Sequence, residues 1–348
     1  MIRKSRLYEA LLTCAVFFWI SVSCYSQLSD EALRKVAAMS TQVNELSVSG
    51  DLLSPLLVPR AAGTPENERV RDYIINYFND LNWNVEVDSF TDETPFGPKQ
   101  FSNIIVTKDT NATDHLVLAA HFDSKYFENF EFIGATDSAV PCAILMSLAK
   151  HLDPILATHS GDTSLQLIFF DGEEAFVQWS DTDSTYGARH LATKWSQTPY
   201  QSRVSKTVKS QTMLDRIQVL VLLDLLGTPN PRIPNYYRST SGLFTAITDL
   251  EQRLFSLSLL ETKSTKTVSG LQPIFDPYSA MNFKGNAVSD DHVPFRRRGV
   301  RILHIIPAPF PYVWHSELDN ADCIDPAQVR NLAILFRAFV LEYLNLEP

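Results

Sequence analysis

The chain has 348 residues and a formal net charge of −10 at pH 7, and 45% of its residues are hydrophobic. This composition is that of an ordinary globular protein with a well-buried core, and we find no internal repeat or low-complexity tract. The negative charge argues against nucleic acid and against anionic membrane surfaces as partners.

Residues 1–26 are predicted to form a targeting segment. Three basic residues near the start precede an apolar stretch from Leu11 to Val22, and small residues up to Ser26 suit cleavage there. The apolar stretch is shorter than the roughly 20 residues that a membrane-spanning helix needs. A secretory signal is therefore the first interpretation, a mitochondrial presequence the second and a retained membrane anchor the third. Residues 27–348 are expected to form a single α/β domain with no stable membrane span.

The elements that follow alternate between strands and helices. Thr64 and Pro65 predict the start of a helix with an apolar stripe as far as Leu81. Strands are predicted over 83–90, 103–107, 116–120, 165–170, 217–223 and 300–306, with the first two paired as a hairpin. Further helices are predicted over 138–152, 186–195, 242–260 and 326–343. Buried apolar strands between helices indicate an α/β fold with a largely parallel central sheet covered on both faces.

Cysteines, glycosylation and basic runs carry little functional signal. Two of the four cysteines, Cys142 and Cys323, would remain after processing and are predicted to be free thiols. Asn111 lies in an Asn-x-Thr sequon between two predicted strands and is a glycosylation candidate if the chain enters the secretory pathway. The basic run 296–298 is expected to form local ion pairs or a solvated turn.

The strand predicted over 165–170 ends in Asp171-Gly172-Glu173-Glu174. The Asp-Gly pair predicts a sharp turn out of the strand. Adjacent carboxylates raise each other's pKa unless a cation neutralises one of them. A metal ion satisfies this requirement if one Glu binds it and the other acts as a base. Taken alone, the motif is more typical of a solvated acidic turn.

Other predicted strands also end in residues that can bind a metal. His121 and Asp123 follow the strand at 116–120, and Asp224 follows the strand at 217–223. In open α/β sheets, ligands bind outside the carboxyl ends of the strands, so these side chains are expected to share one crevice. Asp137 precedes a predicted helix, where N-capping is an alternative role, and His315 lies in a proline-containing loop among aromatic residues. Oxygen and nitrogen ligands without thiolates suit a catalytic zinc ion.

Several sequence blocks together resemble a known family. They are HFDSKY at 121–126, GATDSAVPC at 134–142, FFDGEEAF at 169–176, LLDL at 222–225, DDHVPF at 290–295 and PFPYVWH at 309–315. In this order they resemble the animal glutaminyl-peptide cyclotransferases, which are relatives of the zinc aminopeptidases of the M28 type. The resemblance covers nearly everything after the targeting segment. It implies a three-layer α/β sandwich with a mixed, mostly parallel central sheet.

The resemblance also implies an active site. One zinc ion per chain would be held by Asp137, Glu174 and His315, with Glu173 as general acid/base and Asp224 as a second catalytic carboxylate. The implied pocket residues are Trp179, Asp290, His304, Phe310 and Trp314.

Two positions depart from the family pattern. Ala120 stands where secreted relatives commonly have a cysteine paired with the one at position 142, and Ser289 stands where close vertebrate relatives have Gln. The first departure removes a disulfide, and the second is expected to alter loop contacts or substrate preference.

The implied reaction converts N-terminal glutaminyl residues of peptides or proteins to pyroglutamate and releases ammonia. N-terminal Glu is a further candidate substrate, and the protein is expected to be a secreted monomer. Cleavage after Ser26 would expose Gln27, itself such a substrate. The alternative is a zinc aminopeptidase in which His121 and Asp224 help to bind a second metal. A non-catalytic peptide-binding protein is a third possibility, although every ligand and acid/base position is filled with suitable chemistry.

Overall fold

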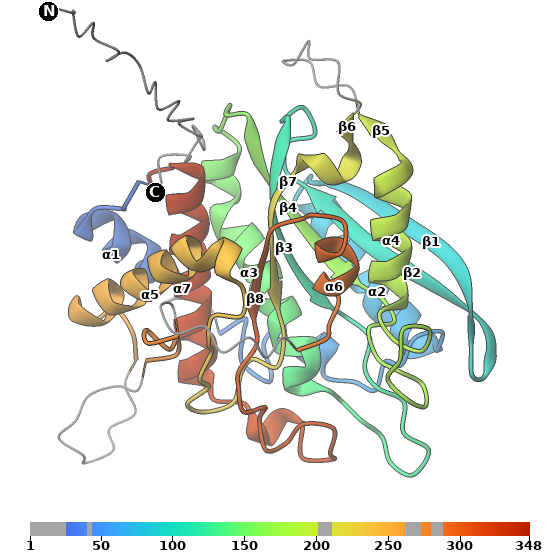
Figure 1. Cartoon of the computed structure of the whole chain (residues 1–348). Coiled ribbons are helices and arrows are strands. Elements are labelled where there is room, and N and C mark those ends of the chain that lie inside the picture. The colour runs from blue at the N-terminus through green and yellow to red at the C-terminus, as the bar shows by residue number, and fades with distance from the viewer. Residues whose placement is uncertain (1–25, 40–43, 201–210, 262–272, 280–287) are drawn as a thin grey trace, which may run out of the picture.

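The computed structural model describes residues 26–39, 44–200, 211–261, 273–279 and 288–348. The targeting segment up to residue 25, with Cys14 and Cys24, lies outside this part of the chain. A six-stranded sheet in the order β1-β2-β4-β3-β7-β8 occupies the centre, with helices on both sides (Figure 1). The predicted fold class, a three-layer α/β sandwich with a mixed sheet, is confirmed.

The sheet combines an antiparallel hairpin with four parallel strands. The strands are β1 (Asn84–Thr94), β2 (Gly97–Thr107), β3 (Asp114–His121), β4 (Thr163–Phe170), β7 (Ile217–Leu223) and β8 (Ile302–Ile305). Strands β4, β3, β7 and β8 are parallel, and β2 joins the hairpin to β4 in antiparallel orientation. A separate two-stranded sheet pairs β5 (Pro199–Tyr200) with β6 (Gln211–Thr212).

Alternate residues of the central strands pack into two different apolar clusters. In β3, Leu116 and Leu118 face one cluster, whereas Val117 and Ala119 face the other. Successive strand side chains point to opposite faces, so a strand buried on both faces reads as an uninterrupted apolar run. This is the reason why the sequence shows apolar runs rather than alternation in the parallel strands.

Seven α-helices complete the described part of the chain. They are α1 (Asp30–Ala38), α2 (Pro65–Asp80), α3 (Val140–Leu156), α4 (Tyr186–Gln197), α5 (Ser241–Ser256), α6 (His292–Arg296) and α7 (Pro326–Leu344). Buried apolar residues of α1, α2, α3, α5 and α7 belong to one cluster, and most of those of α4, with Phe295 of α6, belong to the other. Helices therefore cover both faces of the sheet.

Helix boundaries follow local signals in most places. The Thr64 side chain accepts a hydrogen bond from the Asn67 N–H at 3.3 Å and begins α2 as predicted. The helix predicted from 138 begins at Val140 instead, because 135–139 forms an irregular turn with non-helical dihedral angles at Asp137. The helix predicted to reach 260 ends at Ser256, because Ser258 takes a positive φ of 58° that reverses the chain.

The segment Ala135–Leu156 is long and apolar enough to cross a membrane, with a mean hydropathy of 1.3. However, 72% of its most apolar 18-residue stretch is buried inside the protein, where α3 packs against the sheet and α7. Its hydrophobicity therefore reflects its place in the core.

Three smaller predictions can be located in the structure. Cys142 and Cys323 are free and buried. Asn111 is exposed in the turn between β2 and β3, while its glycosylation stays a prediction. In the basic run, Arg297 forms an exposed ion pair with Asp181 at 3.4 Å, which is one of the two expected roles.

Candidate active site

The carboxyl ends of β3, β4 and β7 bring the predicted site residues together. The parallel register aligns His121 with Phe170, so the loops after β3 and β4 begin side by side. Asp224 directly follows β7 on the other side of β3. This arrangement is the crevice that the sequence predicted at the carboxyl edge of the sheet.

The turn after β4 requires a glycine. Gly172 has a φ of +70°, and a Cβ at this position would lie 2.5 Å from a ring carbon of Phe101. The preceding Asp171 is buried, and its carboxylate accepts hydrogen bonds from the Ser102 N–H at 2.8 Å and the Asn67 side-chain amide at 3.0 Å. Asp171 therefore anchors the turn rather than facing the crevice.

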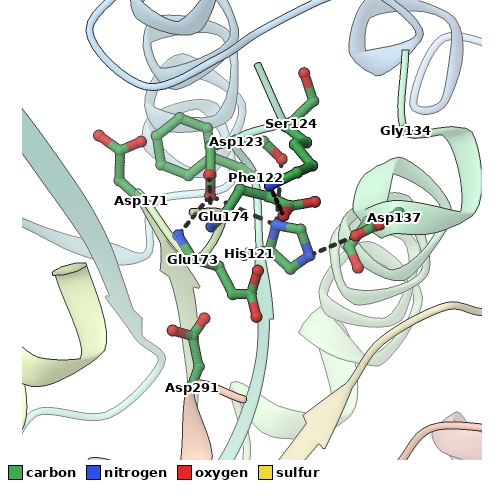
Figure 2. A network of polar contacts seen from close by, with 12 residues as sticks. His121, Phe122, Asp123, Ser124, Gly134, Asp137, Asp171, Glu173, Glu174 and Asp291 are labelled. Atoms are coloured by element: carbon green, nitrogen blue, oxygen red, sulfur yellow. Dashed lines mark hydrogen bonds and ion pairs between the residues drawn. The ribbon is translucent and has the colours of Figure 1, made fainter. Parts of the chain in front are cut away.

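Asp123 holds the main chain of both glutamates. Its Oδ1 accepts a hydrogen bond from the Glu173 N–H at 3.1 Å, and its Oδ2 accepts one from the Glu174 N–H at 3.2 Å (Figure 2). Both glutamate side chains border the same cavity. The sequence indicated Asp123 only as a candidate ligand, and its position two residues after a strand did not reveal this supporting role.

Asp137, Glu174 and His315 form one compact group. One ligand atom from each lies within 4.8 Å of the others. The His315 Nε2 is 3.1 Å from Glu174 Oε1 and 3.4 Å from Asp137 Oδ2. The His315 ring stacks on Trp314, with the ring centres 4.2 Å apart, which restricts its orientation.

The chemistry of this group fits a zinc ion. The Asp137 Oδ2 and the Glu174 Oε2 are buried and make no hydrogen bond of good geometry within the described chain; Asp137 Oδ2 has only the ion-pair contact with His315 Nε2 at 3.4 Å, and Glu174 Oε2 has one with Lys125 Nζ at 3.7 Å. A buried carboxylate oxygen without a partner is costly unless a cation approaches it. Carboxylate oxygens and imidazole nitrogens both bind zinc, and catalytic zinc sites typically have three protein ligands and leave a fourth position open.

The charges in the crevice shift several pKa values. Burial raises the pKa of Glu173 well above its usual range; Glu174 and Asp290 add to this effect, while His121 opposes it. Burial also raises the pKa of Glu174, with Asp137 adding to the increase. A carboxyl group with a raised pKa can exchange a proton near neutral pH, which is what a general acid/base requires.

His121, Asp137 and Asp224 form a second group whose ligand atoms also lie within 4.8 Å of one another. The His121 Nε2 is 3.1 Å from Asp137 Oδ1 and 3.4 Å from Asp224 Oδ1. However, Asp224 Oδ1 already accepts hydrogen bonds from the Ser138 hydroxyl and from the Leu225 N–H at 2.8 Å. These donors leave that oxygen less available to a second metal.

A cavity of about 480 Å³ opens onto these groups. Its lining includes Glu173, Asp224 and the three aromatic side chains expected there, Trp179, Phe310 and Trp314. Trp179 and Trp314 are 39% and 43% exposed, so they stand at the mouth of the cavity. Phe310 packs edge-on against Trp314, with the ring centres 4.9 Å apart.

Comparisons with known proteins agree with this geometry. A sequence model described as "Peptidase family M28" matches residues 103–340. The chain is 45% identical over 296 residues to the glutaminyl-peptide cyclotransferase of Drosophila melanogaster, which covers 84% of this chain and 80% of that protein. It is 42% identical over 342 residues to the corresponding protein of Bos taurus, which covers 94% and 90% of the two chains. The chain belongs to the glutaminyl-peptide cyclotransferase family.

The fold comparison supports the same assignment. The crystal structure of glutaminyl cyclase from Macrostomum lignano matches with a TM-score of 0.80 and 38% sequence identity. The match covers 93% of this chain and 96% of that one. The cyclotransferase family resemblance inferred from the sequence blocks is therefore confirmed.

Asp290 and His304, expected in the pocket of this family member, lie behind the cavity wall. Both are buried, and the His304 Nε2 is 2.7 Å from Asp290 Oδ2. Neither side chain lines the cavity. Burial raises the pKa of Asp224, and the charges of Asp137 and Asp290 add to this increase. The family resemblance placed them near the reacting groups but could not show that neither lines the cavity.

The two departures from the family pattern have different consequences here. Ala120 is fully buried, and Cys142 donates a hydrogen bond from its thiol to the His121 carbonyl at 3.1 Å. The absent disulfide is thus replaced by packing and by one weak hydrogen bond. Ser289 lines the cavity, so a change at this position alters the surface that a substrate meets.

Proposed function

We propose that this protein is a zinc-dependent glutaminyl-peptide cyclotransferase. Its substrates are peptides or proteins with N-terminal Gln, and its products are pyroglutamyl peptides and ammonia. The observation that carries the proposal is the position of Glu173 in one cavity with the Asp137–Glu174–His315 group. Membership of the family supplies the reaction class.

Glu173 is the proposed general acid/base. The nucleophile is the α-amine of the substrate itself, so ring closure is intramolecular and depends chiefly on positioning. Glu173 would accept a proton from this amine and later deliver it to the departing ammonia, and its raised pKa suits both steps. Glu173 is buried, and electrostatic interactions are stronger where water is excluded.

Asp137, Glu174 and His315 are the proposed ligands of one zinc ion. When bound there, zinc supplies a Lewis acid that polarises the γ-carbonyl of the substrate. Trp179, Phe310 and Trp314 border the space in which a glutamine side chain would lie. Their rings exclude water, which would otherwise favour simple hydrolysis of the amide.

Asp224 is proposed to orient the amine or amide protons of the substrate. It lines the cavity, and its Oδ1 is held by the Ser138 hydroxyl and the Leu225 N–H. Asp290, whose carboxylate lies 2.7 Å from the His304 ring nitrogen, is proposed to act on Asp224 through its charge. Their individual contributions can be separated by substitution of one carboxylate at a time.

A zinc aminopeptidase is the second candidate function. The group of His121, Asp137 and Asp224 favours it, because it resembles a second metal position beside the first. The hydrogen bonds already made by Asp224 favour the cyclotransferase instead.

One assay separates these two functions. Purified protein is incubated with a glutaminyl dipeptide, and ammonia, product mass and zinc content are measured together. Loss of one ammonia from an intact dipeptide, with one zinc per chain, is the expected result. A cleaved peptide bond with two zinc ions per chain would identify an aminopeptidase.

We also propose that the chain enters the secretory pathway and acts as a monomer after removal of residues 1–26. Leu28 is buried, and its N–H donates to the Glu342 carboxylate at 2.9 Å, so the chain packs against α7 directly after the proposed cleavage site. Mass spectrometry of the secreted protein tests this boundary. It would also reveal a glycan at Asn111 and a pyroglutamyl residue at Gln27, whereas retention of the protein in mitochondria would contradict the proposal.

A further inference from the structure

Arg60 is a fully buried arginine that lies behind the active site. Its side chain is 0% exposed, and it does not line the cavity. A buried arginine is usually paired with a carboxylate. Within the described chain, however, all hydrogen-bond acceptors of this guanidinium are main-chain carbonyl oxygens.

These carbonyls belong to two segments that carry site residues. The Arg60 Nε donates to the Phe122 carbonyl at 2.6 Å, between His121 and Asp123. The Nη2 donates to the Gly134 carbonyl at 3.0 Å, and the Nη1 donates to the carbonyls of Ile133 and Val58. One rigid, planar group therefore joins the loop after β3 to the loop that leads to Asp137.

The segment before Asp137 has little freedom of its own to adjust. Gly134 has a φ of +59°, and a Cβ there would lie 2.1 Å from the carbonyl oxygen of Asp137. Because the main chain folds back so closely on itself, a shift of the Gly134 carbonyl is transmitted directly to Asp137.

The main chain of Arg60 is connected, through Asn67, to the turn after β4. Its N–H donates to the Ser124 hydroxyl at 2.9 Å, and its carbonyl accepts a hydrogen bond from the Asn67 side chain at 3.3 Å. The same Asn67 amide also donates to Asp171 Oδ1 at 3.0 Å, at the turn that carries the two glutamates. The loops after β3 and β4 and the loop before α3 thus share one support.

Charge adds to this geometric connection. Burial lowers the pKa of Arg60, while the charges of Asp123, Asp137 and Asp319 act in the opposite direction. The guanidinium is therefore a buried cation next to several buried carboxylates. It favours the ionised forms that bind a metal or accept main-chain hydrogen bonds.

We propose that Arg60 is the positioning residue of the zinc site, because its guanidinium sets the spacing between the Asp123 loop and the Asp137 loop. The assignment of the metal ligands rests on the proposed function. Asp123 holds the main chain of Glu173 and Glu174, so the Arg60 side chain also acts, through Asp123, on the turn after β4.

Lysine cannot replace this arginine. The guanidinium uses a fixed fork of donors to reach four carbonyls in different directions, whereas an ammonium group has three donors on a single nitrogen. Arg60→Lys therefore keeps the positive charge but loses the set of hydrogen bonds that fixes the distance between the two loops. Arg337 in α7 is equally buried and does not line the cavity, so Arg337→Lys is a matched control.

The test compares zinc affinity, measured by competition with a chelator, in the wild type and both variants. Arg60→Lys is expected to weaken zinc binding by about 10- to 100-fold, the range typical for residues that orient metal ligands. It should also lower kcat more than it raises KM. Arg337→Lys is expected to lower the unfolding midpoint of the zinc-free protein without changing zinc affinity.

Three results would overturn the proposal. The first is a zinc affinity of Arg60→Lys that differs from the wild type by less than about twofold, because residues that orient metal ligands usually change it far more. The second is an equal loss of affinity in Arg337→Lys, which would indicate general destabilisation. If Arg60→Lys does not fold, Ser124→Ala is the alternative variant, because it removes the acceptor of the Arg60 N–H and should weaken zinc binding severalfold. The third refuting result is a zinc affinity of Ser124→Ala equal to that of the wild type. Zinc affinity is measured without substrate, so the outcome is independent of whether the cyclisation assay succeeds.

Discussion

Zinc is expected to compete with a proton on His315. In the metal-free site, burial acts to lower the pKa of His315, but hydrogen bonds to Asp137 and Glu174 outweigh it and raise the pKa to about 9. The imidazole is therefore protonated at neutral pH. Because only a neutral imidazole binds zinc, this proton must leave when the metal binds.

The size of the effect follows from the pKa. Release of one proton makes the apparent zinc affinity about tenfold weaker for each pH unit below the pKa of about 9. The dissociation constant at pH 6 is therefore expected to be about 100-fold higher than at pH 8, a difference of roughly 3 kcal/mol. Protonation of Glu174, whose pKa burial also raises, would make the dependence steeper.

Chelator competition at pH 6, 7 and 8 measures this dependence directly. Calorimetry in two buffers with different ionisation enthalpies counts the protons released per zinc ion. A dissociation constant that changes less than about threefold between pH 6 and pH 8 would mean that no proton is displaced. The interpretation of His315 as a charged partner of both carboxylates would then be wrong.

Three further predictions address the base, the turn and the acid stability of the fold. Glu173→Gln should lower kcat by about 10²- to 10⁴-fold while zinc content stays intact; ammonia release and metal analysis test this, and near-normal turnover would refute the assignment. Gly172→Ala combines a φ of +70° with a contact at 2.5 Å to Phe101 and should lower the free energy of unfolding by about 1–3 kcal/mol. An unchanged midpoint in urea would contradict that reading of the turn. Burial acts to raise the pKa of Glu45, but hydrogen bonds from three α3 side chains lower it from 4.5 to about 2. Its stabilising contribution is complete above pH 4.5 and is lost as the pH falls through 2, so the free energy of unfolding of the wild type should fall by roughly 3 kcal/mol more than that of Glu45→Gln between pH 5 and pH 2. If the free energy of unfolding falls equally in the two proteins between pH 5 and pH 2, the role assigned to Glu45 is wrong.

The sequence was informative wherever a local rule acts on adjacent residues. Asp325 and Pro326 predicted the start of α7, and the Asp325 side chain caps it by accepting a hydrogen bond from the Ala327 N–H at 3.1 Å. The parallel strands were visible as apolar runs because both of their faces are buried. The short helices α1 and α6 were not predicted, because too few residues repeat in them for a periodic pattern to emerge.

For the site, the sequence alone placed His121, Glu173, Glu174 and Asp224 at strand ends, because a parallel sheet brings its carboxyl ends to one edge. It could not show that Asp290 is excluded from the cavity lining, since that depends on how β8 and α6 pack. Nor could it assign the supporting role of Arg60.

The reason is physical. Ligand type and strand position are properties of neighbouring residues, and a single chain segment carries them. The spacing of Asp137, Glu174 and His315, and the main-chain hydrogen bonds of Arg60 and Asp123, join segments far apart in the sequence. Only the packing of the complete sheet brings these segments within hydrogen-bond distance, and the raised pKa of Glu173 follows from the burial that this packing produces.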